Sequence, residues 1–279
     1  MIREIKHITQ SIPTMDGDGV ALQRNALFDG RLDPFLMLDE IKAEPNDSPN
    51  SFPIHPHRGI QTLSYIINGS MQHKDSLGNE SLIKAGDLQW MHTGQGILHS
   101  EKPGVDDKGL WGFQFWLNVP RPEKYQTPDY ADIPAELSKT VQIEQAQLKI
   151  LAGHWQFNHQ TYQVSFQKLS GQGALTDIYW SAPSEITLQS SASSLGLFII
   201  EGQIEINQQT TLKKGTLVQF NSGEEILLNS PKEQPSRLLI FKGEPINEPI
   251  YHRGSFVMTN AEEMEETVKA YQNGTLIVP

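Results

Sequence analysis

The chain has 279 residues, 37% of them hydrophobic and 20% charged, which excludes a disordered or coiled-coil protein. A net charge of −11 disfavours direct nucleic-acid binding, and no run of four Lys/Arg provides a basic patch. Cysteine is absent, which excludes disulfides, thiolate metal sites and a cysteine nucleophile. Neither a signal-peptide core nor an apolar stretch of membrane-spanning length occurs, so we expect a cytoplasmic protein without a membrane partner.

Short apolar runs between turn signals recur along the chain and predict β-strands. They are rich in β-branched and aromatic residues, and most are too short for helices. The clearest runs cover 62–67, 111–119, 147–152, 195–200 and 216–220. Asn68-Gly69 and Glu201-Gly202 stand where two strands would turn back on each other, which predicts hairpins. Many short strands with Gly-centred turns indicate an all-β sandwich or barrel.

A faint internal repeat relates the two halves of the chain. In the first half YIINGSM is followed by SLIKAGDLQWM, and in the second FIIEGQIEI is followed by TTLKKGTLVQF. Each copy reads as a strand, a Gly turn, a second strand and then K-x-G-x-L. Two related β domains are the simplest account, with a border in the Pro-rich stretch 120–134.

The clearest helical signal lies near the end of the chain, at 260–272. Asn260 can cap this helix, Glu263 stands at the capping-box position, and Asn273-Gly274 can end it. An apolar stripe of Met264, Val268 and Tyr271 runs along the same segment. The stripe predicts that the helix packs on another part of the fold.

Two pairs of ligand-type residues share one spacing. His55 and His57 lie two apart, and on an extended strand such residues point to the same face. His99 and Glu101 repeat this spacing after a Gly-rich turn. On neighbouring strands the two pairs would present three imidazoles and one carboxylate to Fe(II), Mn, Ni, Cu or Zn. A single H-x-H pair is more often a surface or turn feature, so the second pair is what favours a metal site.

The other histidines show no comparable pairing. We expect His73, on the strand after the first hairpin, to be solvated or to contact a metal ligand. His92 lies close to the Gly-rich turn, and the rest look ordinary: His7, His154, His159 and His252.

At these residues the chain resembles the pirin family of the cupin superfamily. The resemblance covers nearly the whole chain and rests on DPFLMLDE (33–40), FPIHPHRGIQTLSYIINGSMQHKDSLGNE (52–80), AGDLQWMHTGQGILHSE (85–101) and EPIYHRGSFVMTN (248–260). It implies a bicupin: two stacked antiparallel β-barrels, or jelly rolls, with a short C-terminal helix packing on the N-terminal barrel. We therefore expect a metal-binding domain at 1–130, a cupin-like domain without metal at 131–245, and a returning tail at 246–279.

The resemblance also implies iron, as Fe(II), bound by His55, His57, His99 and Glu101. A typical cupin takes its carboxylate from four or five residues after the second histidine, where this chain has Gln61 and Thr62. Glu101 restores the negative charge from the other motif. In the second half, SSASS (190–194) and NSGEEILL (221–228) stand where the ligands belong, and no histidine occurs between 160 and 251.

The activity implied by the resemblance is that of a quercetin 2,3-dioxygenase, which opens a flavonol ring with O₂ and releases CO. Glu101 would act as ligand and as general base for the substrate hydroxyl. Phe52, Trp90 and Met91 could line an apolar slot for a planar enol, although each could equally belong to the barrel core. Arg58 could pair with Glu101 or orient the substrate, or it could form a surface salt bridge.

Two rival functions remain open from the sequence. The family includes proteins that regulate transcription factors or metabolic enzymes by protein–protein contact, and an acidic surface suits a protein partner better than DNA. An isomerase or storage cupin could use the same pocket. Oxygen uptake with quercetin discriminates the enzyme from the regulator.

Overall fold

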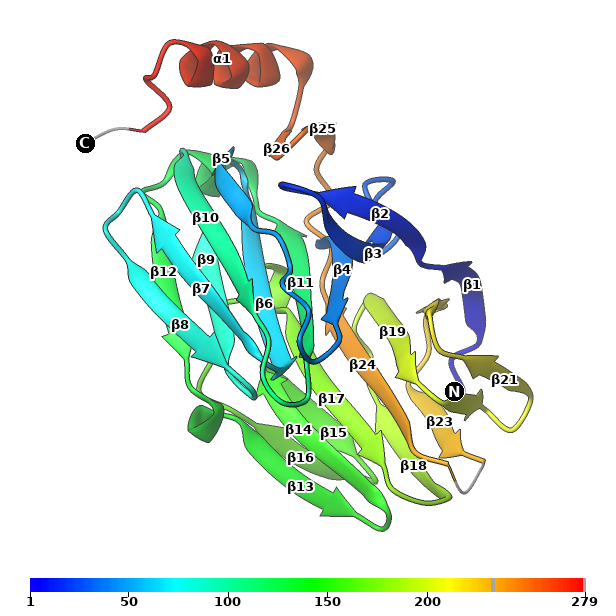
Figure 1. Ribbon diagram of the computed structural model, residues 1–279. Coiled ribbons are helices and arrows are strands. Elements are labelled where there is room, and N and C mark those ends of the chain that lie inside the picture. Colours follow the sequence, from blue (N-terminus) through cyan, green and yellow to red (C-terminus); the bar gives the residue numbers. More distant parts are fainter. Residues whose placement is uncertain (232–233, 278–279) are drawn as a thin grey trace. The chain divides into compact units, whose positions relative to one another are not determined.

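The computed structural model describes residues 1–231 and 234–277 and contains many antiparallel strands and a single α-helix in that part of the chain (Figure 1). The chain divides into two compact units. The first unit comprises Ile12–Ala135 and Ile246–Pro279, and the second comprises Met1–Ser11 and Glu136–Pro245. The all-β bicupin class predicted from the sequence is confirmed. No helix in the described residues is long and apolar enough to cross a membrane.

The first unit is built from two antiparallel sheets. Its larger sheet has the order β12 (Asp129–Ile133), β9 (Leu88–His92), β6 (Ile60–Asn68), β11 (Leu110–Asn118), β4 (Phe35–Ala43), β3 (Val20–Ala26), β2 (Ile12–Asp16). The smaller sheet has the order β5 (Phe52–His57), β10 (Ile97–Gly104), β7 (Ser70–Asp75), β8 (Glu80–Lys84).

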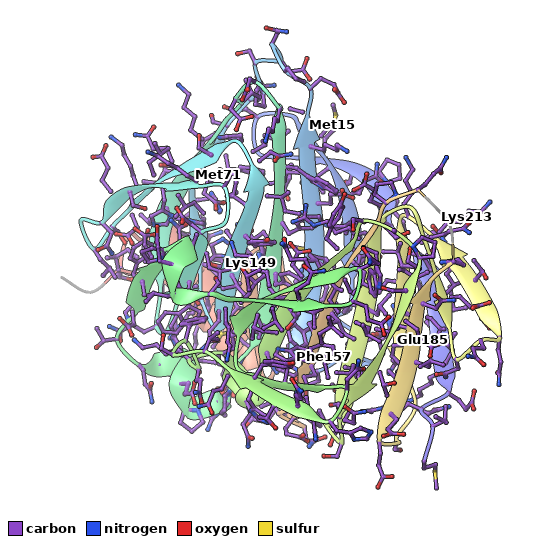
Figure 2. All side chains as sticks on the ribbon, turned by 90° about the horizontal axis from the view of Figure 1, so that it is seen from below. Met15, Met71, Lys149, Phe157, Glu185 and Lys213 are labelled. Atoms are coloured by element: carbon purple, nitrogen blue, oxygen red, sulfur yellow. The ribbon has the colours of Figure 1, made fainter. Side chains whose placement is uncertain are left out.

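The two sheets of the first unit pack face to face around an apolar core. Met71 and Ile83 of the smaller sheet join Leu22, Ile66 and Leu110 of the larger sheet in one buried cluster. Met71 is labelled in Figure 2. This packing is that of a jelly roll, and it holds β5 and β10 side by side at one end of the unit.

The second unit repeats this plan. Its larger sheet has the order β1 (Ile5–Gln10), β22 (Thr216–Phe220), β19 (Ser194–Glu201), β24 (Ser236–Gly243), β17 (Ala174–Trp180), β14 (Ala146–Ala152), β13 (Lys139–Ile143). Its smaller sheet has the order β16 (Gln160–Gln163), β15 (His154–Phe157), β18 (Ser184–Gln189), β23 (Glu225–Ser230), β20 (Gln203–Ile206), β21 (Thr210–Lys213). A buried cluster that includes Trp155, Phe157 and Trp180 joins the two sheets, and Phe157 is labelled in Figure 2.

The five apolar runs predicted as strands fall in β6, β11, β14, β19 and β22. Both predicted hairpins are present, and their glycines have positive φ angles, 77° at Gly69 and 68° at Gly202. L side chains rarely adopt this conformation, which explains glycine at these turns. At both turns a Cβ would come within 2.5 Å of a backbone carbonyl oxygen. The internal repeat seen in the sequence is therefore a repeat of hairpins.

The start of the chain belongs to the second unit. β1 pairs with β22, whereas β12 takes the corresponding edge beside β9 in the first unit. The domain borders expected at 130 and 245 stay a prediction. The compact units differ from the expected domains because the first eleven residues belong to the second unit. The difference arises because strand pairing between β1 and β22 is non-local and leaves no signal in a local pattern.

The predicted C-terminal helix is present as α1 (Ala261–Gln272), and Asn260 caps it by accepting a hydrogen bond from the Glu263 amide at 2.9 Å. The Glu263 carboxylate bonds to the Thr259 amide rather than to the cap residue itself, and it pairs with Arg121. Met264 packs in a cluster with Phe256, Met258 and Leu276, which the hairpin of β25 (Tyr251–Arg253) and β26 (Phe256–Met258) helps to form. The helix thus docks within the first unit, as predicted.

Replacing Met264 with alanine should lower the free energy of unfolding by about 2–5 kcal/mol, the usual cost of emptying a buried methionine site. Met264 is 1% exposed and contributes to no candidate site, so stability is the affected quantity. Urea denaturation measures the change, with Glu265→Ala on the exposed face of α1 as the matched control. Equal stability of the two variants would mean that docking of α1 contributes little.

Candidate metal centre

Three histidines of the first unit converge at one end of the jelly roll. His55 and His57 are carried by β5 and His99 by β10, and the strand register places His99 directly opposite His55. One nitrogen from each ring lies within 4.8 Å of the others. The i, i+2 spacing puts His55 and His57 on one face of β5, as the sequence predicted.

The hydrogen bonds of the first pair determine which nitrogens face the centre. His55 Nδ1 donates to the Pro53 carbonyl at 2.8 Å, and His57 Nδ1 donates to the Ser255 carbonyl at 3.3 Å. A carbonyl can only accept, so both Nδ1 atoms carry the proton and both Nε2 atoms present lone pairs. These Nε2 atoms lie 3.1 Å apart. Two acceptors at this distance repel each other unless a cation or proton lies between them.

His99 is oriented by a second histidine. Its Nδ1 lies 3.5 Å from Nδ1 of His73, whose Nε2 lies 3.3 Å from the Asp75 carboxylate. The Asp75 carboxylate accepts a hydrogen bond from His73 Nε2–H, so His73 Nδ1 is the acceptor for His99 Nδ1–H. This leaves His99 Nε2 as a lone pair, buried and without a hydrogen-bond partner among the described residues. The chain Asp75–His73–His99 therefore aims a third lone pair.

Burial favours the neutral form of the His57 and His99 imidazoles, which is the form that binds metals. Burial and the neighbouring His55 lower the pKa of His57 to about 3. Burial, together with the other histidines, also lowers the pKa of His99 well below its ordinary value. Neutral imidazole is the ligating form, so the cluster fits a divalent metal ion.

Asp75→Asn should weaken metal binding by about 10–100-fold, because outer groups that fix a ligand's tautomer contribute this much to affinity. Isothermal titration with a divalent metal measures the change. Asp75 also accepts the Leu77 and Asn79 amides of its turn. Asp106→Asn is the matched control, because Asp106 caps a turn in the same way, through Lys108 and Gly69. Equal affinity in the two variants would contradict the orienting role.

Glu101 lies in the same region but is bound to another side chain. It is carried by β10, is 4% exposed, and both carboxylate oxygens accept hydrogen bonds from Gln114 Nε2, at 2.9 and 3.2 Å. Its carboxylate is not part of the group of ligand atoms that the three histidines form. The role of Glu101 as fourth ligand therefore remains a proposal.

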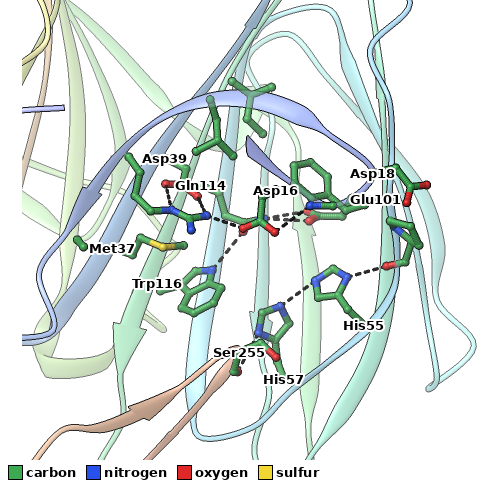
Figure 3. Close-up of a pocket in the computed structure, with 18 of the residues that line it drawn as sticks. Asp16, Asp18, Met37, Asp39, His55, His57, Glu101, Gln114, Trp116 and Ser255 are labelled. Carbon is green, nitrogen blue, oxygen red and sulfur yellow. Dashed lines mark hydrogen bonds and ion pairs between the residues drawn. The ribbon is translucent and has the colours of Figure 1, made fainter. Parts of the chain in front are cut away.

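The histidine cluster opens into a cavity of about 720 Å³ (Figure 3). His55, His57 and Glu101 line it together with side chains from β2, β3, β4 and β11 and from the returning tail. One wall is apolar and aromatic, and includes Phe28, Met37, Ile41, Phe52 and Trp116. Polar side chains of the same strands stand between these residues: Asp16, Arg24, Asp39 and Gln114.

The returning tail builds part of this cavity. The His252 ring stacks on Phe28 with centroids 3.8 Å apart, and the Ser255 carbonyl orients His57. Trp116 meets the His57 ring edge-on at 5.0 Å. The sequence analysis did not identify Gln114, Trp116 or His252 as site residues. Alternation along β11 could have indicated Gln114, a polar residue within the apolar run 111–119.

An ion-pair cluster of Asp16, Arg24 and Asp39 forms part of the cavity lining. Arg24 makes two hydrogen bonds to Asp39, at 2.9 and 2.7 Å, and one to Asp16 at 2.7 Å. These bonds raise the pKa of Arg24 above its ordinary value although burial opposes the shift. Because two carboxylates already pair with it, the Arg24 guanidinium is held in place and is not available to bind an anion.

The other residues suggested for a substrate slot are placed differently. Phe52 lines the cavity, but its described lining does not include Trp90, Met91 or Arg58. Trp90 and Met91 are buried on β9, where they belong to the core of the larger sheet. Arg58 lies over the Tyr125 ring at 5.0 Å, and among the described residues the hydrogen-bond partner of Glu101 is Gln114 rather than Arg58.

The second unit has aliphatic side chains at the equivalent positions. In the first unit β10 and β5 pair Ile97 with His57 and His99 with His55. In the second unit β23 and β18 pair Ile226 with Leu188 and Leu228 with Ile186. All four of these side chains belong to the apolar core of the second unit. Ile186 and Leu188, rather than SSASS (190–194), therefore stand in place of H-x-H, and they offer no ligand atom.

Comparison with known proteins places both units in one protein family. The model for Pirin matches residues 21–117, and the model for the Pirin C-terminal cupin domain matches residues 175–277. Rat pirin is 32% identical over 258 residues, covering 87% of this chain and 82% of its own. The chain belongs to the pirin family. Pirin relatives also include a Vibrio cholerae protein named "Putative quercetin 2,3-dioxygenase", 35% identical over 98% of this chain and 97% of its own.

The fold also matches solved structures. A crystal structure of quercetin 2,3-dioxygenase from Acinetobacter baumannii superposes with a TM-score of 0.88 at 25% identity, covering 99% of each chain. The likeness extends through both units and the C-terminal tail, so the bicupin architecture applies to the whole chain.

Proposed function

We propose that this pirin-family protein is a metal-dependent dioxygenase that opens the ring of a flavonol such as quercetin. The observation that carries the proposal is the convergence of one ring nitrogen each from His55, His57 and His99, within 4.8 Å of one another, beside a 720 Å³ cavity that His55 and His57 line. The names of the Vibrio and Acinetobacter relatives support the choice of substrate class.

The ligand set favours a first-row divalent metal. Three imidazoles with Glu101 as the fourth ligand would make an N₃O set, and we propose Fe(II), with Mn, Ni, Cu or Zn as alternatives. Such an ion would supply Lewis acidity towards an enolate oxygen and, if redox-active, a centre for reaction with O₂. The absence of cysteine in the chain leaves no thiolate competitor.

The protein's own groups would bind and activate the substrate. Glu101 would accept the proton of the flavonol 3-hydroxyl, because it lines the same cavity as His55 and His57 and follows His99 by two residues on β10. Gln114, which donates to both carboxylate oxygens, holds Glu101 in place. Phe28 and Trp116 offer flat surfaces for a planar ring. Both oxygen atoms of O₂ enter the product, and one carbon leaves as CO.

Oxygen uptake and CO release with quercetin test the proposal directly. Protein loaded with Fe(II) should consume O₂ and release CO in equal amounts, and chelation should stop both. Protein that binds one metal per chain but gives no turnover with quercetin or related flavonols would overturn the enzyme proposal. The alternative, an iron-binding regulator acting through protein contacts, would then be the better account.

A further inference from the structure

A second cavity lies in the second unit, is lined only by residues of that unit, and is independent of the proposed oxygenase. It has a volume of about 530 Å³, and its described lining is largely polar. The lining includes His154, Trp155, Gln156, Ser190, Glu224 and Lys242.

Lys242 stands where the fold calls for an apolar residue. Leu238 and Ile240 of β24 belong to the core, and strand alternation puts Lys242 on the same inward face. Its position matches that of Trp116 in the first unit. Trp116 pairs with Thr62, seven residues before Gly69, and Lys242 pairs with Leu195, seven residues before Gly202. Lys242 therefore lies at the end of its own jelly roll that is equivalent to the cavity end of the first unit.

The side chain of Lys242 is largely buried, and among the described residues no carboxylate forms an ion pair with its ammonium group. The residue is 7% exposed, and its Nζ lies 4.8 Å from the centre of the Trp155 ring. Within residues 1–231 and 234–277 it forms no hydrogen bond or ion pair with a protein group. A cation–π contact offsets only part of the cost of burying a charge. An anion from solution would supply the missing partner.

Arg3, a neighbouring cation, has no hydrogen-bonded carboxylate in the described part of the chain. It is buried and donates to the carbonyls of Ser190, Ala192 and Asn221. Glu244 attracts Lys242 without forming an ion pair and is bonded to Ser193. Among the described residues, the Lys242 ammonium therefore lines the cavity without an ion-pair partner.

We propose that this cavity binds a small organic monocarboxylate, whose oxygens pair with the Lys242 ammonium and accept a hydrogen bond from the Ser190 hydroxyl. The Ser190 hydroxyl oxygen accepts from the Ala192 amide, which leaves its proton for a ligand. Glu224, which pairs with the Met1 amino group at 2.6 Å, and Glu225 also line the cavity, and their charge opposes a phosphate or another multiply charged anion more than a monoanion. One negative charge is thus favoured over two.

Titration with sodium acetate tests this site, and acetamide is the neutral control of the same shape. The indole N–H signal of Trp155 in an NMR spectrum reports on the cavity. Acetate should shift this signal with saturation, whereas acetamide should not. Lys242→Met should weaken acetate binding at least tenfold. Lys139→Met is the matched control, since Lys139 lies over the Tyr162 ring in the same unit, and it should bind as wild type.

The pH dependence gives an independent check. Burial, together with Arg3 and against the attraction of Glu244, lowers the pKa of Lys242 to about 8. The ammonium form binds the anion, so acetate affinity should fall as pH rises from 7 to 9. Two other groups that line the cavity have shifted pKa values. The hydrogen bond to Glu224 raises the pKa of the Met1 amino group above its ordinary value, and burial lowers the pKa of His154. The effect of Lys242 is therefore the part of the pH dependence that Lys242→Met removes.

Three results would overturn the proposal: no saturable shift with acetate, an equal shift with acetamide, or unchanged binding by Lys242→Met. None of them depends on metal or on turnover of quercetin, so the test is separate from that of the oxygenase.

Discussion

Glu101→Gln should abolish oxygen uptake with quercetin while retaining part of the bound metal. Glutamine keeps the length of the side chain and leaves the three histidines to hold part of the metal, but it cannot accept the proton of the substrate hydroxyl. Loss of a general base typically costs about 10²–10⁴-fold in rate. We expect a loss in this range, measured as O₂ uptake per bound metal.

Gln114 sharpens this expectation. Its Nε2 donates to both oxygens of Glu101, so the glutamine of the variant would turn its oxygen towards Gln114 and its NH₂ towards the cavity. A donor would then stand where the reaction requires an acceptor. Glu40→Gln is the matched control: Glu40 accepts a hydrogen bond from the Trp111 indole at 2.7 Å and is outside the lining of the cavity. Glu101→Gln with wild-type turnover would reduce Glu101 to a ligand and favour the regulatory alternative.

Much of the fold could be predicted because its signals are local. Gly69 and Gly202 mark hairpins through a backbone conformation that glycine adopts readily, and the apolar runs around them form the central strands. Asn260 likewise marks the start of α1. The placement of β1 could not be predicted, because its partner β22 lies more than 200 residues away and IKHITQ carries no pattern that names it.

The candidate site divides in the same way. The i, i+2 pairs pointed to His55, His57 and His99 because strand geometry converts spacing into a shared face. The groups that orient these histidines are brought into place by tertiary contacts instead. His73 looked either solvated or close to a ligand, and only the register of β7 against β10 brings it to His99. The Ser255 carbonyl reaches His57 from 198 residues away.

The placement of Trp90 and Met91 has a simple physical reason. Both follow an apolar pattern that fits a pocket wall and a barrel core equally well, and apolar character alone cannot distinguish the two. A polar residue of the cavity is the better indicator. Gln114 is half-buried on β11 between the buried Phe113 and Phe115, and a polar side chain in such surroundings requires a partner.

His99→Ala should remove the metal outright, to less than a tenth of the wild-type content by elemental analysis of the purified protein. The substitution deletes one of three converging imidazoles, so His55 and His57 on β5 would lack the ligand that His99 supplies from β10. It also leaves His73 Nδ1 facing an empty space, so the Asp75–His73 chain no longer orients any ligand.

His92→Ala is the matched control, because His92 is also a buried histidine of the first unit but contacts Trp90 and Glu123 instead of the cluster. This variant should retain metal at the wild-type level. Thermal unfolding of both variants without metal separates loss of ligation from loss of folding. If folded His99→Ala kept stoichiometric metal, the ion would have to bind elsewhere, and the convergence of lone pairs at His55, His57 and His99 would have no ligand role.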